Sequence, residues 1–160
     1  MNIVRLEGGI PMNIVRLVRA SLLGLALIFA SASSTDAQAS RSLYERLGGY
    51  NAISAVVDDF ADRLFTDPKV GKFFVGMGTD TRDMFKQKNK NLVCAVTGGP
   101  CKVISRPPKT VHAGLGITDA DFDVVVGHLS AVLDKYKVPA AEKKELMDIV
   151  GSLRKDIVER

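Results

Sequence analysis

The sequence lacks the patterns that mark several common functional classes. Its lysine and arginine residues are not clustered in a stripe with aromatic residues, and the net charge of +4 is mild, which argues against nucleic-acid binding. It contains no Ser-His-Asp set, no pair of acidic residues suited to acid–base catalysis and no phosphate-binding loop. No segment shows the alternation of a β-strand. What remains is a series of helical patterns, two cysteines and two histidines.

The first 39 residues have the layout of a secretory signal peptide. Arg16 and Arg19 precede an apolar run over residues 21–30, and Ala37-Gln38-Ala39 supplies the small residues that favour cleavage after Ala39. The run is shorter than the ~20 residues of a membrane-spanning helix, so we expect no stable membrane span; an uncleaved anchor is the alternative. The protein is therefore expected to be periplasmic or secreted.

A short repeat lies upstream of this apolar run. Residues 1–6 recur as residues 12–17, which is too short a match for a repeat architecture. It suggests that translation begins at Met12 and that residues 1–11 are a gene-start artefact. The mature chain, residues 40–160, has the length of one domain with a modest core.

Cys94 and Cys101 flank a tight turn, Thr97-Gly98-Gly99-Pro100. In an exported protein a close pair of this kind forms a disulfide, and closing so short a loop stabilises the fold by about 2–3 kcal/mol. A redox or metal-binding pair is the alternative, although no further ligand lies nearby in the sequence.

The mature chain carries one helical pattern after another. A capping box at Ser42 and Glu45 opens a very short helix that ends at Gly48-Gly49. Apolar residues at spacings of three and four then predict helices over about residues 51–65 and 80–96, a fourth helix over 118–136, and a last helix with Pro139 at its first position. The expected fold class is all-α, with sequential helices packed as neighbours.

His112 is the most informative single residue. It lies on a short apolar turn between a proline-rich linker, residues 106–108, and a hinge that contains Gly114 and Gly116. A lone imidazole on a short, adjustable segment that faces a longer apolar helix is suited to holding a haem iron from one side. The alternative is an ordinary structural histidine.

The ordered motifs resemble the group 1 truncated haemoglobins, over residues 42–158. The resemblance implies a two-over-two α-helical sandwich around haem b, and it names His112 as the proximal iron ligand. His128 matches a family histidine that is not a ligand, so we expect it to be structural. The matching motifs are Ser42-Leu43-Tyr44-Glu45-Arg46-Leu47-Gly48-Gly49, Asp59-Phe60, Asp67-Pro68, Phe73-Phe74, Gly98-Gly99-Pro100, His112-x-Gly-x-Gly-Ile-Thr, and Phe122 ahead of Gly127-His128-Leu129.

The resemblance also implies which residues contact the haem. Phe74 matches a phenylalanine that stacks on the haem face, and residues of the second, third and fourth helices match the rest of the pocket. In each case the alternative is a plain core residue. The expected haem contacts are Phe60, Phe74, Phe85, Lys88, Asn89, Ile117, Phe122 and Val125.

The distal side departs from the family pattern. Ala61 stands where many members have a tyrosine that donates a hydrogen bond to bound oxygen, which leaves Asn89 as a donor. Lys88 is either a solvated lysine or haem-propionate partner, the favoured interpretation, or a sixth ligand of the iron through its neutral amine. Val93 replaces a phenylalanine that lines a ligand tunnel in some members.

We therefore expect an exported haem protein that reversibly binds oxygen, nitric oxide or carbon monoxide. One alternative is an enzyme, either a nitric oxide dioxygenase served by an electron-donor protein or a peroxidase-type redox enzyme. Another is a haem-free helical domain, held by its disulfide, that binds partner proteins.

Overall fold

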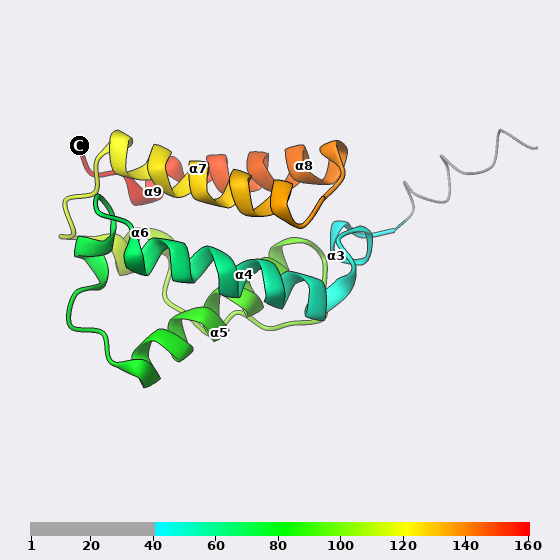
Figure 1. The fold of residues 1–160 in the computed structure, drawn as a ribbon, viewed down its shortest axis with the longest axis horizontal. Helices are drawn as coiled ribbons and strands as arrows, with labels where there is room; N and C mark the ends of the chain where they lie inside the picture. The colour runs from blue at the N-terminus through cyan, green and yellow to red at the C-terminus, as the bar shows by residue number, and fades with distance from the viewer. Residues whose placement is uncertain (1–40) are drawn as a thin grey trace, which may run out of the picture. The chain divides into compact units, whose positions relative to one another are not determined.

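Helices make up the regular structure of residues 41–160, which the computed structural model describes (Figure 1). The predicted signal peptide and its cleavage site lie outside the described residues. The all-α fold class is confirmed. None of the described helices is both long and apolar enough to cross a membrane. The elements are α3 (Leu43–Arg46), α4 (Gly49–Thr66), the 3-10 turn η1 (Gly71–Phe74), α5 (Thr79–Val96), α6 (Pro108–His112), α7 (Asp119–Lys135), α8 (Ala140–Ser152) and α9 (Arg154–Ile157).

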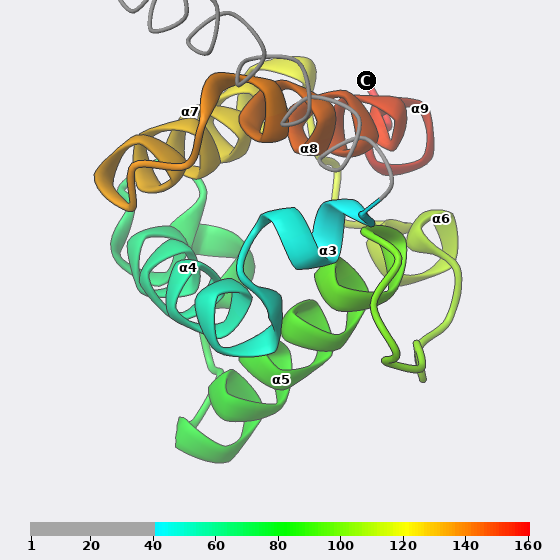
Figure 2. The same cartoon turned by 90° about the vertical axis from the view of Figure 1, so that its right-hand side faces the viewer.

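The four long helices form two stacked pairs. α4 packs against α5, α7 packs against α8, and a contact between α4 and α7 joins the pairs. In Figure 1, α7 and α8 lie on one side of α4 while α5 lies on the other. The short α6 stands apart from the four long helices, beside α9 (Figure 2). This is the two-over-two arrangement expected from the sequence.

A cluster of leucines joins the two layers. Each of its members is less than a tenth exposed, and half-buried side chains such as Phe60 and Val93 pack against it. Because α3, α7 and α8 all contribute to this cluster, its burial ties the first short helix to the C-terminal pair. The buried members are Leu43, Leu129, Leu133 and Leu146.

The helix starts follow local signals. The Ser42 hydroxyl accepts from the Glu45 amide at 3.2 Å while the Glu45 carboxylate accepts from the Ser42 amide at 2.9 Å, which is the predicted capping box. α4 begins at Gly49 rather than near residue 51. Gly48 and Gly49 both take left-handed φ values, of 93° and 74°, so the turn is complete within these two glycines and the helix starts at the second of them.

The expected last helix is interrupted. α8 ends at Ser152, and α9 begins two residues later, after Leu153. The prediction of one continuous helix from Pro139 is wrong here, because Gly151 and Ser152 weaken the helix together: glycine has low helix propensity, and the Ser152 hydroxyl bonds the Ile149 carbonyl at 2.7 Å. The short helix that follows, α9, contacts α6.

The two cysteines lie at the junction of α5 and the linker to α6. Their sulfur atoms are 2.05 Å apart, which is the geometry of the expected disulfide. Cys94 is fully buried. The intervening turn requires glycine at Gly99, where an added Cβ would lie 2.7 Å from the Cys94 carbonyl oxygen and 2.5 Å from the Tyr44 ring.

Candidate haem site

α6 presents His112 in a defined orientation. Pro107 and Pro108 begin this helix, and His112 is its last residue. The His112 ring nitrogen Nδ1 lies 2.8 Å from the Pro108 carbonyl oxygen, one helical turn back. Since a carbonyl only accepts, Nδ1 carries a proton, and in the neutral imidazole this leaves Nε2 as the nitrogen with a lone pair. A histidine that binds a metal is typically held by this kind of second contact.

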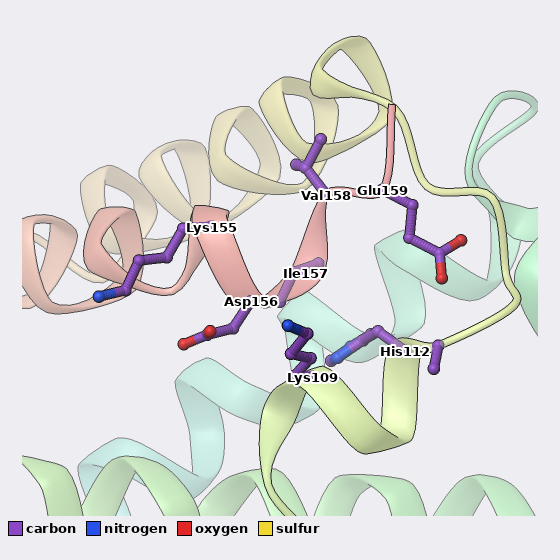
Figure 3. Close-up of a pocket in the computed structure, with 8 residues that line it drawn as sticks. Lys109, His112, Lys155, Asp156, Ile157, Val158 and Glu159 are labelled. Carbon is purple, nitrogen blue, oxygen red and sulfur yellow. The ribbon is translucent and has the colours of Figure 1, made fainter.

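The His112 ring lines a cleft between α6 and α9. The cleft has a volume of about 300 Å³. Figure 3 shows the His112 ring and the Lys109 side chain facing Ile157 of α9. Both apolar and charged groups therefore surround the imidazole. The lining residues are Lys109, His112, Ala113, Lys155, Asp156, Ile157, Val158 and Glu159.

Ion pairs show which face of α5 is directed toward α4. Lys86 and Lys90 form ion pairs with Asp62 and Asp58 of α4, at 2.6 and 2.8 Å, so this face of α5 is directed toward α4. Lys88 is two residues from each of them, and helical geometry places it roughly opposite. Its side chain is exposed and makes no ion pair within residues 41–160.

Phe85 is three residues before Lys88 and four before Asn89, so it neighbours both of them on the helix surface. Lys88 and Asn89 are adjacent in sequence and point about 100° apart; Asn89 and Phe85 are half-buried, whereas Lys88 is exposed. The Asn89 side-chain amide donates to the Phe85 carbonyl oxygen at 2.9 Å. One of its two N–H groups is thus held by its own helix.

Phe74 and Phe85 are brought together, as expected for residues of one pocket. With Phe65 they form a cluster of edge-to-face pairs whose ring centroids are 5.2 to 5.5 Å apart. Phe60, by contrast, packs against the leucine cluster between the layers. Ala61 is fully buried, so this position of α4 offers no side-chain donor.

The start of α7 supplies the remaining predicted contacts. Ile117 and Phe122 are buried, and Val125 is half-buried. The Arg154 guanidinium of α9 lies 4.5 Å from the Phe122 ring centre and pairs with Asp119 and Asp123 of α7. This contact leaves no signal in the sequence, because Arg154 is distant in the chain and belongs to no motif.

A second capping box fixes this start of α7. The Thr118 hydroxyl donates to the Asp121 carboxylate at 2.7 Å and accepts from the Asp121 amide at 3.2 Å. The pKa of Asp121 is lowered to about 2, first by the hydrogen bonds from the Thr118 hydroxyl and the Thr118 amide, and then by nearby Lys72. The carboxylate is therefore ionised at neutral pH. It binds Thr118, the last residue of the loop that follows His112.

The other histidine is engaged elsewhere. His128 Nε2 lies 2.8 Å from the Asp67 carboxylate, which also accepts from the amides of Lys69 and Val70. The Val70 amide, followed by the His128 ring, lowers the pKa of Asp67. His128 thus links α7 to the turn after α4, which agrees with its expected structural role.

Comparison with known proteins places this arrangement in a family. The family model of the bacterial-like globins matches residues 42–159. The group 1 truncated haemoglobin GlbN of Mycolicibacterium paratuberculosis is 34% identical over 116 residues, which cover 72% of this chain and 83% of that protein. GlbN of a Nostoc species is 32% identical over 122 residues, with 74% and 98% covered.

Solved structures agree with the sequence relatives. The truncated haemoglobin of Tetrahymena pyriformis in its Fe(III) form matches with a TM-score of 0.69 and 28% identity, covering 75% of this chain and all of that one. The 2/2 haemoglobin of a Synechococcus species, solved with covalently attached haem, matches with a TM-score of 0.68 and 29% identity, covering 75% and 100%. The chain belongs to the bacterial-like globins and, among them, to the group 1 truncated haemoglobins, a family of haem proteins that bind diatomic gases.

Proposed function

We propose that this protein is an exported globin that holds haem b through His112 and reversibly binds oxygen, nitric oxide or carbon monoxide. The observation that carries the proposal is the orientation of His112. Its Nδ1 proton is bound to the Pro108 carbonyl, and its Nε2 lone pair is left for the iron. When bound, the haem supplies an iron atom whose open side takes the diatomic gas.

The segment that contains α6 carries several exposed apolar side chains. Of the eight large apolar side chains that are exposed in residues 41–160, five lie between residues 96 and 115. Exposed apolar side chains favour a binding site, and we propose that a porphyrin covers them beside the mixed apolar and charged lining of the cleft. These five are Val96, Val103, Ile104, Val111 and Leu115.

The pairing of the two cysteines supports non-covalent haem binding, without a bond between the haem and a cysteine sulfur. Covalent haem attachment through cysteine requires free thiols beside the proximal histidine. Here Cys94 and Cys101 are paired with each other, eleven or more residues from His112. The same pairing supports export, because disulfides persist in oxidising compartments. Sequencing the N-terminus of the exported protein tests the cleavage after Ala39.

The distal residues support weak retention of oxygen. The buried Ala61 has no hydrogen-bond donor, and Asn89 has already given one N–H to Phe85. A hydrogen bond in a dry pocket contributes about 0.5–1.5 kcal/mol, so the loss of one donor speeds oxygen release by roughly two- to tenfold. Lys88 is exposed on α5, which supports a solvated lysine or a partner of a haem propionate; a sixth ligand of the iron is the alternative.

Absorption spectroscopy tests the assignment of His112. The chain from residue 40 is titrated with haemin, and His112→Ala is compared with His128→Ala, which removes the only other histidine. We expect a one-to-one Soret band in the wild type and in His128→Ala, and a lost or shifted band in His112→Ala. Equal spectra for all three proteins would show that His112 does not bind the iron.

A further inference from the structure

A carboxylate near the end of the chain holds the loop that follows His112. Glu159 accepts from the backbone amides of Gly114 and Gly116, one with each of its oxygens, both at 2.5 Å. Its own amide donates to the Ile117 carbonyl oxygen at 2.9 Å. Three hydrogen bonds from one residue therefore bind the segment after α9 to the loop between α6 and α7.

The loop backbone is shaped to bind an anion at this point. Gly114 and Gly116 both take left-handed conformations, with φ of 83° and 65°, which glycine adopts without steric cost. Their two amides point to one side, and amides arranged in this way form a concave site for negative charge. The same two hydrogen bonds lower the pKa of Glu159, so the carboxylate is charged when it occupies the site.

The orientation of His112 depends on this loop because α6 has little stability of its own. It has five residues, and isolated helices shorter than about 12 residues are marginal in water. Only Ala113 separates His112 from Gly114. A loop with two glycines is also among the most flexible kinds of chain when nothing holds it. α6 packs mainly against α9, the helix that Glu159 follows.

We propose that Glu159 is a positioning residue for the haem iron ligand, fixing the loop 113–118 so that His112 Nε2 is held in the cleft between α6 and α9. Figure 3 shows Glu159 reaching the loop on one side of the end of α6, while the His112 ring lies on the other side. The proposal rests on the assignment of His112 as the ligand. It adds that the ligand geometry is set by a residue 47 positions later, as the numbering of His112 and Glu159 gives.

The variant Glu159→Gln removes the charge at nearly constant size. A neutral amide offers one acceptor oxygen and one N–H₂ donor, so in the orientation of Glu159 one of the two loop amides would face an N–H₂ group and lose its acceptor. Glu145→Gln is the matched control, because Glu145 is an exposed carboxylate on α8 that pairs with Arg46, far from the loop in sequence. Glu159→Asp keeps the charge with a shorter reach, and we expect it to lie between the wild type and Glu159→Gln.

Two measurements on the haem-loaded protein report the ligand geometry. The iron–histidine stretching band in the resonance Raman spectrum of the ferrous protein should shift or broaden in Glu159→Gln and stay unchanged in Glu145→Gln. Haem transfer to an excess of a haem-scavenging apoprotein should be faster by about tenfold in Glu159→Gln, the typical effect of losing a residue that supports a metal ligand.

Amide hydrogen exchange in the haem-free protein reports the clamp itself, that is, the two hydrogen bonds from the Gly114 and Gly116 amides to the Glu159 carboxylate. The Gly114 and Gly116 amides should exchange faster in Glu159→Gln than in the wild type or in Glu145→Gln. If they do, and the Raman band and haem transfer still equal those of the wild type, the clamp exists but does not position the ligand, and the proposal is overturned. Unchanged exchange overturns it as well. A wild type that binds no haem through His112 instead overturns the assignment of function, and with it this inference.

Discussion

Breaking the bond between Cys94 and Cys101 should destabilise the fold by an amount that follows from the length of the loop it closes. The two residues are seven apart in sequence. In the chain-entropy model, closing a loop of about eight residues lowers the entropy of the unfolded chain by roughly 8 cal/mol/K. The disulfide therefore stabilises the fold by about 2.5 kcal/mol at 25 °C. The described domain has 120 residues, Arg41–Arg160, and its unfolding entropy is then about 0.25 kcal/mol/K. The expected fall in Tm on reduction is therefore on the order of 10 °C.

Thermal unfolding with and without a reductant measures this effect. The control is the double variant Cys94→Ala with Cys101→Ala, whose Tm should not respond to the reductant. It should lie below the reduced wild type, because alanine at the fully buried Cys94 also loses packing. A wild type whose Tm changes by no more than that of the double variant would refute the reasoning. So would the titration of two free thiols in the folded protein before any reduction.

Three further outcomes are expected. Thr118→Ala should lower the free energy of unfolding by about 1 kcal/mol in urea titrations, because it removes the cap of α7. Asp121 should stabilise the fold above its unfolded pKa near 3.8, and this contribution should be lost as pH falls toward about 2, the folded pKa; the stability difference between wild type and Asp121→Asn over that range measures it. Lys88→Ala should leave the ferric absorption spectrum of the haem-loaded protein unchanged, because the exposed side chain can remain solvated.

Each of these outcomes has its own control or contrary result. Thr79→Ala is matched to Thr118→Ala, since Thr79 also lies at a helix start but caps nothing, and it should change stability by less than about 0.5 kcal/mol. A stability difference for Asp121→Asn that is constant from pH 6 to pH 2 would contradict the sign given above. A low-spin, six-coordinate ferric spectrum that disappears in Lys88→Ala would identify Lys88 as the sixth ligand.

The features that the sequence predicts well are those with local causes. The capping box at Ser42 and the cap at Thr118 each involve residues three apart, so a short window contains all the information. Apolar spacing predicts α4, α5 and α7 with ends that agree within about two residues, which is the usual uncertainty of helix ends, whereas it does not predict the end of α8. The short turn of helix at His112 was predicted from the flanking prolines and glycines.

The sequence does not predict contacts between distant segments. It also does not predict features that depend on a small difference in stability, such as whether a helix continues or ends. The clamp by Glu159 pairs a carboxylate with bare backbone amides of Gly114 and Gly116, and backbone donors leave no mark in a sequence. The sequence does not predict the interruption at Leu153, because the apolar spacing continues through it to Ile157, while the neighbouring glycine and serine end α8. The contact of Arg154 with Phe122 has the same long-range character.

The contacts of α9 with α6, and of Glu159 with the loop after α6, make this end of the protein sensitive to changes in length. Each residue added to a helix turns everything beyond it by about 100° and moves it by 1.5 Å. A single insertion or deletion between Leu153 and Ile157 would therefore carry Ile157 away from α6 and point Glu159 away from its two amides. Substitutions on the exposed side of α9 leave that register intact. We therefore expect this segment to tolerate substitutions but not insertions or deletions.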